Sequence, residues 1–318
     1  KSKTYSEQFS VITPREISHH RLRFKLVIYL ENFYQIYQYR KYRNKVKISD
    51  QDVIINFSYD SYFLRKVFPN NKIITFLNDD FEEQTKLIGY SVGKTALLKT
   101  IKISDYLLST SPMLIERYSK CIQNSDVFLP WFSGTVLSKA KDNQNKSSRK
   151  AVLIWAFITE RIDFEAIACL LSNKKHITID VYGPVHYRVK DRVDALSSLY
   201  TNINFYPSCK VDEIELDRYF CTLTPYLSQN QNKTIFVTNK FFQLAKNGLP
   251  FINLGLPNFI EASGVFNCNS YSEMLLAVDD CLENNSALGH DLMLAIAEHS
   301  EKSRLKQLSG IINDLNSN

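Results

Sequence analysis

Short apolar segments alternate with longer helical segments along most of this sequence. From residue 52 the expected elements are, in chain order, strand 52–57, helix 59–68, strand 72–77, helix 91–103, strand 106–109, helix 111–123 and strand 127–130. Parallel strands need a crossover of a dozen or so residues between them, and strands buried on both faces read as continuous apolar runs. The alternation therefore predicts an α/β fold built on parallel sheets.

A polar segment divides this pattern into two halves. Residues 138–150 contain Ala140 as their one aliphatic residue, which is typical of a linker. The pattern then restarts with strand 151–157, helix 161–173, strand 177–182, helix 187–199, strands 203–206, 219–223, 251–254 and 265–266, helix 270–284 and a helical tail from 288 to about 309. We expect two Rossmann-like domains, 1–148 and 149–318, that face each other across a cleft, with the last helix packing back on the first domain. Ligands bind at the carboxyl ends of parallel strands, so the cleft is the expected active site.

The charge differs between the two halves. Residues 1–150 carry 25 Lys and Arg against 14 Asp and Glu, whereas residues 151–318 carry 14 against 19. A basic first half indicates an anionic partner such as a nucleic acid, a lipid surface or a pyrophosphate. Its charge is spread rather than clustered with a known motif, so we expect no nucleic-acid partner. The six cysteines form no CxxC pair, and we expect reduced thiols in a cytoplasmic protein.

Residues 31–47 (ENFYQIYQYRKYRNKVK) interleave aromatic and basic residues in a segment with helical character. Aromatic rings with a basic end suit a helix lying in an anionic membrane interface. The alternative is a helix that packs its aromatic stripe into its own domain.

The stretch 238–257 (TNKFFQLAKNGLPFINLGLP) is the most informative candidate site. A short helix that begins with Asn239 places Lys240 and Gln243 on one face. Gly248 is expected to end this helix in a left-handed conformation. A cation and an amide at a helix start, beside a strand, form a plausible site for a phosphorylated ligand. The alternative is a surface helix with a solvated lysine.

Other sequence motifs do not carry a function. Residues 89–95 (GYSVGKT) look like a phosphate-binding loop, but three residues separate the glycines where the motif needs four, so we reject it. The absence of GxGxxG argues against a dinucleotide dehydrogenase. No HExxH and no Cys/His cluster occurs, so we expect no metal.

Two acidic residues, Asp79 and Asp80, follow the expected strand 72–77. Carboxylates at the carboxyl end of a strand point toward the expected cleft, where one of them would serve as a general base. The alternative is an N-terminal cap of the next helix, because Asp is favoured there.

Three further polar residues follow strands in the second half. Glu160 and Arg161 lie where strand 151–157 gives way to a helix, and Arg161 is placed to pair with a diphosphate. Tyr226 follows strand 219–223, where an aromatic ring would stack on or bond a nucleotide. We therefore expect Glu160, Arg161 and Tyr226 in a donor-binding site with Asn239.

Several segments together resemble the GT-B glycosyltransferases. They are AVLIWAFITERIDFEAIACLL, ITIDVYGPV, INFYPSCKVDEI, TPYL and NKFFQLAKNGLPFINLGLP in the second half, and IITFLNDDFEE, ISDYLLSTSPML and VFLPWFSG in the first. These segments cover most of residues 52–280. The resemblance implies a GT-B fold whose second domain binds a nucleotide sugar. The glycine-bearing first strand and loop of such a fold are not found, so we expect part of the N-terminus to be missing.

One departure points to a subgroup. Many GT-B enzymes carry a glutamate that holds the donor ribose where this chain has Gln243. The pair of Lys240 and Gln243 is instead similar to the xanthan glucuronosyltransferase type, glycosyltransferase family 70. That resemblance implies Lys240 on the donor phosphates, Gln243 and Tyr226 near the nucleotide, and Asp79 as the base of an inverting transfer. It also implies a polyprenyl-pyrophosphate-linked oligosaccharide acceptor at the membrane surface.

The predicted function is therefore hexosyl or glucuronosyl transfer from a nucleoside-diphosphate sugar, UDP-linked, in the assembly of a surface polysaccharide such as an exopolysaccharide or capsule. The enzyme would be metal-independent, cytoplasmic and peripheral on the inner face of the cell membrane. The alternative is a non-catalytic GT-B-like protein that binds sugars or scaffolds an assembly complex.

Overall fold

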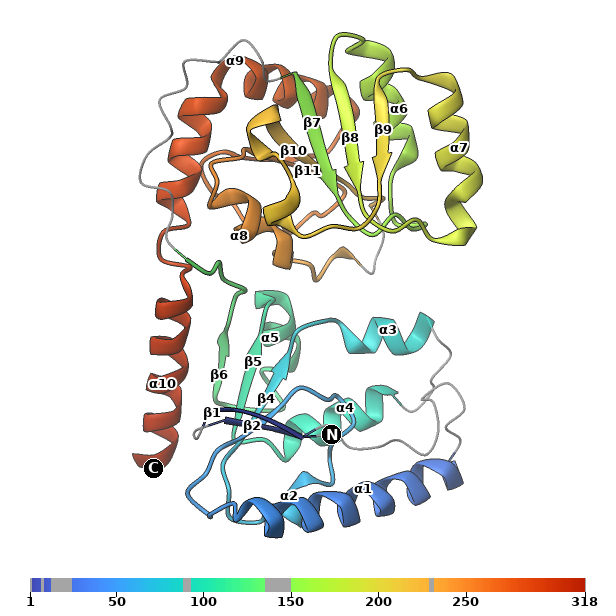
Figure 1. The fold of residues 1–318 in the computed structure, drawn as a ribbon. Coiled ribbons are helices and arrows are strands. Elements are labelled where there is room, and N and C mark those ends of the chain that lie inside the picture. Colours follow the sequence, from blue (N-terminus) through green and yellow to red (C-terminus); the bar gives the residue numbers. More distant parts are fainter. Residues whose placement is uncertain are drawn as a thin grey trace. The chain divides into compact units, whose positions relative to one another are not determined.

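The chain folds into two compact units (Figure 1). A computed structural model describes residues 2–6, 9–12, 25–87, 93–134, 150–228 and 232–317. Unit 1 comprises Lys1–Phe128 and Ser309–Asn318, and unit 2 comprises Leu129–Leu308. The predicted domain boundary at 148/149 lies outside the described residues.

Unit 1 is built on a four-stranded parallel sheet in the order β3-β4-β5-β6. Its strands are β3 (Ile54–Asn56), β4 (Ile73–Leu77), β5 (Tyr106–Ser109) and β6 (Ser125–Val127). The helices after them are α2 (Leu64–Val67), α3 (Phe81–Leu87), α4 (Gly93–Lys102) and α5 (Pro112–Tyr118). The predicted alternation is confirmed. The last strand is earlier than the expected 127–130, since Pro130 lacks the N–H that a ladder requires.

Two elements precede this sheet. Strands β1 (Ser2–Ser6) and β2 (Phe9–Ile12) pair with each other in a separate antiparallel sheet. Helix α1 (Lys25–Val46) then packs Ile36 and Tyr39 against the buried Phe63 and Phe68. Within the described residues, β3 is the first strand to join the parallel sheet of unit 1.

Unit 2 contains a six-stranded parallel sheet in the order β12-β11-β10-β7-β8-β9. Its strands are β7 (Ala151–Trp155), β8 (Thr178–Tyr182), β9 (Ile203–Tyr206), β10 (Tyr219–Pro225), β11 (Phe251–Leu254) and β12 (Val265–Cys268). The chain first builds outward from β7 to β9 and then returns to build outward from β10 to β12. This is the doubly wound order of a Rossmann fold, with its switch point between β7 and β10.

Helices cover both faces of this sheet. They are α6 (Phe164–Asn173), α7 (Lys190–Leu199), α8 (Asn239–Ala245) and α9 (Tyr271–Ala295), with single 3₁₀ turns at Tyr187–Val189, Val211–Glu213 and Leu216–Arg218. On one face, Ile167 of α6 and Val278 of α9 share a buried core with Ile154 of β7. On the other face, Phe241 of α8 meets Phe251 of β11 edge to face, with ring centroids 5.1 Å apart. Both faces of the strands are therefore buried, as their continuous apolar sequences predicted.

The C-terminal helices differ from the prediction. The expected helix 270–284 continues through a kink at Asn284 to Ala295, and α10 (Glu301–Ser317) begins after a break. The predicted tail from 288 to 309 was therefore wrong in its bounds. The sequence on both sides of the break keeps a helical apolar period, so periodicity alone does not reveal it.

Candidate functional site

The loops after β7 and β10 meet at the switch point of unit 2. The backbone N–H of Asp163 donates to the Pro225 carbonyl at 2.9 Å, and that of Leu227 donates to the Arg161 carbonyl at 2.8 Å. A β-bridge also pairs Ile162 with Tyr226. In doubly wound sheets the ligand crevice lies outside the carboxyl ends of the strands at this point. This edge of unit 2 is therefore where a ligand crevice is expected.

Lys240 lies at the end of β7. Its Nζ donates a hydrogen bond of 3.0 Å to the carbonyl oxygen of Trp155 and lies 4.7 Å from the centroid of the Trp155 ring. Helix α8 buries Phe241, Phe242 and two further apolar residues, which leaves the partly buried Lys240 on its other face. Burial lowers the pKa of the Lys240 ammonium to about 8, against a smaller opposing effect of Cys209. The ammonium is therefore short of compensating negative charge, which an anionic ligand would supply.

The other predicted residues of α8 lie beside Lys240 in the same helix. Gln243 follows one turn later and is half-buried, whereas Asn239 is exposed at the helix start. Gly248 has a φ of +69°, the left-handed conformation predicted for the residue that ends this helix. The shared face of Lys240 and Gln243 is thus present as predicted.

Arg161 and Tyr226 lie close to each other at the same edge. Burial raises the pKa of the Tyr226 phenol, and the nearby Arg161 guanidinium opposes this rise. Both side chains are partly buried, and their backbones are joined by the β-bridge at Ile162. The Arg161 guanidinium therefore lies near enough to the Tyr226 phenol to act on its ionisation, beside the end of β10.

A glycine after β11 allows the loops after β10 and β11 to pack closely on each other. Gly255 has a φ of +83°, and a Cβ atom added there would lie 1.8 Å from the carbonyl oxygen of Tyr226. Only glycine fits such an approach. Gly255 lies in the stretch 238–257, but its role could not be predicted from the sequence because a close approach between two loops is a long-range property.

Glu160 has partners away from Lys240. Its exposed carboxylate lies 3.6 Å from Arg188 and 3.9 Å from His186, on the loop after β8. A hydrogen bond from its own backbone N–H and these basic neighbours lower the pKa of Glu160. The described contacts of Glu160 therefore belong to a different part of the strand edge from Lys240, although it was grouped with the donor site from the sequence.

An aromatic residue ends each of three neighbouring strands, a feature that was not predicted from the sequence. Trp155 pairs in register with Tyr182, and Tyr182 pairs with Tyr206. The Tyr182 and Tyr206 rings are stacked, with centroids 4.5 Å apart and an interplanar angle of 15°. The sequence signal was available, since AVLIW, TIDVY and INFY all end in an aromatic residue. Lys240 lies over one end of this row.

A buried carboxylate supports the aromatic row. Asp180 is fully buried and accepts hydrogen bonds of 2.8 Å from the Tyr219 hydroxyl and from Asn204 Nδ2. Arg218 lies 3.7 Å from the same carboxylate. Burial, with the hydrogen bonds to Tyr182 and Asp180, raises the pKa of Tyr219, so this phenol remains a neutral donor. The hydrogen bond between the Tyr219 and Tyr182 hydroxyls then restricts the position of the Tyr182 ring.

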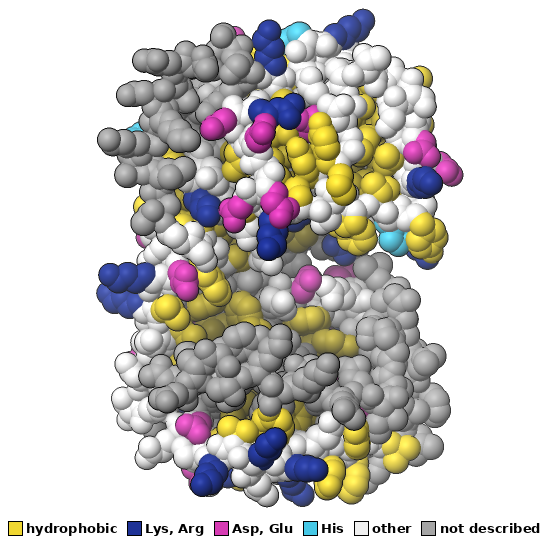
Figure 2. Space-filling model, viewed as in Figure 1, with side chains coloured by type: hydrophobic (Ala, Val, Ile, Leu, Met, Phe, Trp, Pro, Cys, Tyr) yellow, Lys and Arg dark blue, Asp and Glu magenta, His cyan; other side chains and the backbone are white. Residues whose placement is uncertain are grey.

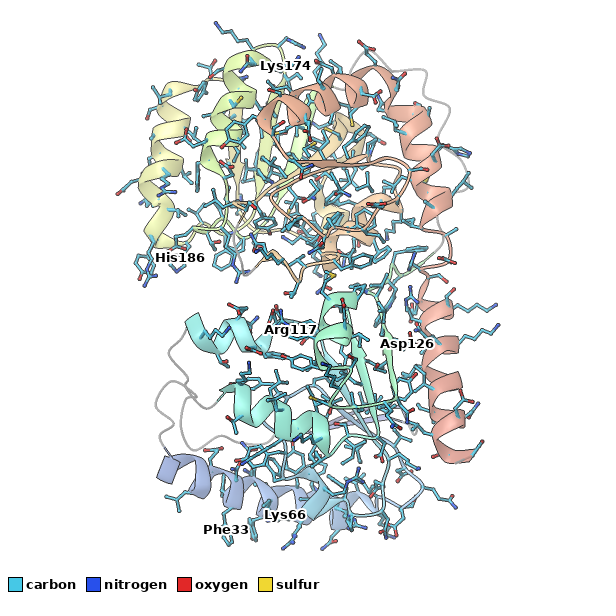
Figure 3. All side chains as sticks on the ribbon, turned by 180° about the vertical axis from the view of Figure 1, so that it is seen from behind. Phe33, Lys66, Arg117, Asp126, Lys174 and His186 are labelled. Carbon is cyan, nitrogen blue, oxygen red and sulfur yellow. The ribbon has the colours of Figure 1, made fainter. Side chains whose placement is uncertain are left out.

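In unit 1, the two acidic residues after β4 have different environments. Asp80 is buried and accepts two hydrogen bonds of 3.0 Å from Arg117, and its Oδ1 also caps α3 by accepting from the Glu83 N–H. Asp79 is exposed and accepts from the Asp80 N–H at 3.1 Å. Arg117, in the last turn of α5, is labelled in Figure 3. Asp80 thus has the capping contacts of the alternative interpretation, and Asp79 is the solvent-exposed carboxylate of the two.

Two residues of the rejected phosphate-loop motif, Gly93 and Lys94, lie in the described part of the chain and have structural roles. Residues 88–92 lie outside the described residues, but Gly93 packs so closely on Thr85 that an added Cβ would lie 2.5 Å from it. The Nζ of Lys94 donates to Glu82 at 2.9 Å. Although burial raises the pKa of Glu82, the hydrogen bonds and charges of Lys94 and Lys86 together lower it more, so the carboxylate stays ionised. Gly93 and Lys94 therefore serve the packing of α4 on α3.

The described residues contain no group of three or more His, Cys, Asp or Glu side chains arranged to hold a metal ion. None of their helices combines the length and the apolar character needed to cross a bilayer.

Comparison with known proteins relates this architecture to solved structures. No protein-family model matches the chain, and no curated protein does either. HepE from Anabaena, solved with UDP and glucose, matches with a TM-score of 0.65 at 9% identity over 91% of this chain and 81% of HepE. The lipopolysaccharide outer core galactosyltransferase WaaB matches with a TM-score of 0.63 at 10% identity over 90% of this chain and 81% of WaaB. A UDP-forming α,α-trehalose-phosphate synthase from Burkholderia xenovorans, solved with glucose-6-phosphate, gives 0.68 at 11% identity over 92% and 80%.

At these identities the likeness extends to the fold, and the finer resemblance to glycosyltransferase family 70 stays a prediction. The two units with parallel sheets, the doubly wound strand order of unit 2 and the matches over most of both chains agree with one another. The chain therefore has the GT-B fold of glycosyltransferases, as the sequence predicted.

Proposed function

We propose that this protein is a glycosyltransferase that moves a sugar from a UDP-linked donor to a glycan acceptor. The observation that carries the proposal is Lys240, a desolvated ammonium at the end of β7 beside the switch point of a GT-B fold. HepE has been solved with UDP-glucose, and its fold is similar to this one. A partly buried cation whose described partners are a carbonyl oxygen and an aromatic ring is costly, so its presence at a ligand-binding edge favours an anionic substrate.

In the proposed donor complex, Lys240 and Arg161 would bind the diphosphate and stabilise it as it leaves. Gln243, Asn239 and Tyr226 would contact the nucleotide. The charge that develops on the leaving diphosphate would be met by these side chains, and the proposed mechanism uses no metal.

The proposed base is Asp79. It would take the proton from an acceptor hydroxyl as that oxygen attacks the anomeric carbon, with inversion of configuration. Its exposure after β4 supports this role, and we propose a supporting role for Asp80, which accepts two hydrogen bonds from Arg117. We further propose that the enzyme is of the family 70 type and acts on a polyprenyl-pyrophosphate-linked oligosaccharide in surface polysaccharide assembly.

We also propose that α1 binds the inner face of the cell membrane. Along its exposed side, Leu30, Phe33 (69% exposed) and Tyr37 (60%) are followed by Arg40 and Lys41. Their spacing of three to four residues places them on one stripe of the helix. Phe33 points away from unit 1 in Figure 3, and Figure 2 shows basic and hydrophobic side chains together along this side of the unit. Apolar rings followed by cations are what an anionic lipid interface binds.

Substitution of both Phe33 and Tyr37 by serine is expected to weaken binding to anionic vesicles by about tenfold or more, because two rings are lost from the interface. The measurement is co-sedimentation with vesicles of phosphatidylglycerol and phosphatidylcholine in equal parts. Leu276→Ser, which removes an exposed apolar side chain from α9, is the control and should bind as the wild type does. Equal binding by all three proteins would refute the role of α1.

The donor assignment is tested by thermal unfolding with UDP, GDP and ADP and with their common sugars. We expect UDP or a UDP-sugar to raise the melting temperature selectively, since a ligand at 100 times its Kd stabilises by about 2.7 kcal/mol. Lys240→Ala should abolish this rise. No shift with any nucleotide would refute the proposed enzyme and leave the non-catalytic GT-B-like alternative.

A further inference from the structure

Unit 2 carries an exposed aromatic patch at the ends of β7 and β8. Phe157 is 52% exposed, Val185 37% and Tyr187 74%. Three polar residues, Glu160, His186 and Arg188, surround them. We call these six residues the rim patch. Of these six residues, only Glu160 was expected from the sequence to contact the donor. Its described partners, His186 and Arg188, lie within the rim patch.

The backbone under the rim patch is regular. Beyond the last residues of β7 and β8, a parallel β-bridge pairs Ile158 with Val185. The Ile158 N–H donates to the Pro184 carbonyl at 3.0 Å, and the His186 N–H donates to the Ile158 carbonyl at 2.8 Å. The Ile158 side chain is buried in the core of unit 2. The exposed rings are therefore presented by an ordered extension of the sheet.

The rings of the patch contact one another. His186 lies between Phe157, at 6.1 Å and 72°, and Tyr187, at 4.5 Å and 36°. The Arg188 guanidinium lies 5.6 Å from the centroid of the Tyr187 ring, and its Nε donates to the Tyr187 hydroxyl at 3.1 Å. Figure 3 labels His186 at the end of unit 2 where the strands finish, and Figure 2 shows a histidine beside hydrophobic side chains at this corner. These contacts restrict the rings before any ligand binds, which lowers the entropy cost of binding.

The charges of the rim patch cancel. Glu160 and Arg188 lie 3.6 Å apart, and the carboxylate and guanidinium offset each other. His186 Nδ1 accepts from the Arg188 backbone N–H at 3.4 Å. Because Arg188 offsets Glu160, an anionic lipid surface would gain no net attraction from this ion pair. The patch is suited to a neutral ligand that has both an apolar face and many hydroxyl groups.

We infer that the rim patch binds a neutral sugar residue of a glycan. One face of a pyranose ring is lined by C–H groups, which carry partial positive charge and pack on the negative face of an aromatic ring. Its hydroxyl groups both donate and accept, and the carboxylate of Glu160 and the guanidinium of Arg188 offer the matching acceptors and donors. The assignment of this glycan as the acceptor rests on the proposed glycosyltransferase function. Phe157 lies two residues beyond Trp155, so the patch continues the strand edge that holds Lys240.

The experiment uses the full chain without nucleotide on a microarray of bacterial surface oligosaccharides, followed by titration calorimetry with the oligosaccharide that binds best. We expect a neutral oligosaccharide to bind, and the double variant Phe157→Ala, Tyr187→Ala to weaken this binding at least about tenfold. Leu199→Ala, which shortens an exposed apolar side chain on α7, should bind as the wild type does. Tyr187→Phe keeps the ring and should retain most of the affinity.

The same proteins are then tested for the UDP-induced shift in melting temperature and for binding to the vesicles described above. An unchanged UDP shift in the double variant shows that its fold and the donor site are intact. If the wild type lacks a UDP shift but binds the oligosaccharide, the proposed enzyme fails while the rim patch stands. The inference is overturned if no oligosaccharide binds, if the double variant binds it as the wild type does, or if the variant loses binding to vesicles instead.

Discussion

Replacing Lys240 with methionine is expected to abolish the UDP-induced stabilisation and to raise the melting temperature of the ligand-free protein at pH 7. Methionine keeps the length and apolar body of lysine but removes the ammonium. In the free protein that ammonium is desolvated, and its described partners are a carbonyl oxygen and an aromatic ring rather than a carboxylate. Removing an uncompensated charge stabilises the fold, and a rise of about 3 °C is the expected scale. Lys240 would thus lower the stability of the ligand-free protein while providing the charge that binds UDP.

The pH dependence of this effect has a definite sign. Burial lowers the pKa of Lys240 to about 8 in the folded protein, below the value of about 10.4 for an unfolded chain. Between these two values the unfolded state binds more protons, so the stability of the wild type rises with pH across this interval. The advantage of Lys240→Met should therefore be largest below pH 8 and should disappear above about pH 10.5. The measurement is thermal unfolding of both proteins at a series of pH values with and without UDP.

Lys246→Met is the matched control for this substitution. Lys246 lies just after α8, and its Nζ donates to the Ser133 carbonyl at 3.3 Å. This variant should retain the UDP shift and show no pH-dependent gain. A Lys240→Met protein that melts below the wild type at pH 7 would mean that the contacts with Trp155 outweigh the desolvation of the ammonium.

Donor affinity should follow the same ionisation. A diphosphate binds the protonated form of Lys240 and raises its pKa, so affinity is constant below pH 8 and falls as pH rises above it. Retention of full affinity well above pH 8 would show that Arg161 alone carries the electrostatic attraction.

The sequence predicted those parts of the structure that depend on neighbouring residues. Apolar runs and helical periods identified the parallel sheets, and the spacing of Lys240 and Gln243 gave their shared helical face. Gly248 was recognised as a helix end because its left-handed conformation is a local preference.

The parts that could not be predicted depend on contacts between distant segments. Glu160 pairs with Arg188, which lies on another loop, and sequence order alone does not reveal that the loops after β7 and β8 adjoin. The row of Trp155, Tyr182 and Tyr206 follows from strand register, which is fixed only once the sheet forms. The different environments of Asp79 and Asp80 are set by Arg117, which comes from α5. The chemical type of each site residue could thus be predicted from the sequence, whereas the residues that it contacts could not.

Asp79→Asn is expected to lower the rate of sugar transfer by about 10² to 10⁴-fold, the usual contribution of a general base. The amide is nearly isosteric with the carboxylate but does not accept a proton. Because Asp79 is exposed, its replacement should leave both the melting temperature and the UDP shift unchanged. The assay follows release of UDP from the sugar nucleotide that gave the thermal shift, in the presence of a polyprenyl-pyrophosphate-linked oligosaccharide fraction.

Asp80→Asn, the same chemical change one residue later, should act on stability first. It replaces a buried carboxylate that accepts two hydrogen bonds from Arg117 and one from the Glu83 N–H. Losing the charge from such hydrogen bonds costs about 2 kcal/mol, so this variant should melt several degrees lower. Arg117→Met should cause a similar loss, and adding it to Asp80→Asn should cost less than the sum of the two, because both remove one interaction. A stable Asp80→Asn protein without transfer activity, beside a fully active Asp79→Asn protein, would exchange the two roles and make Asp80 the base.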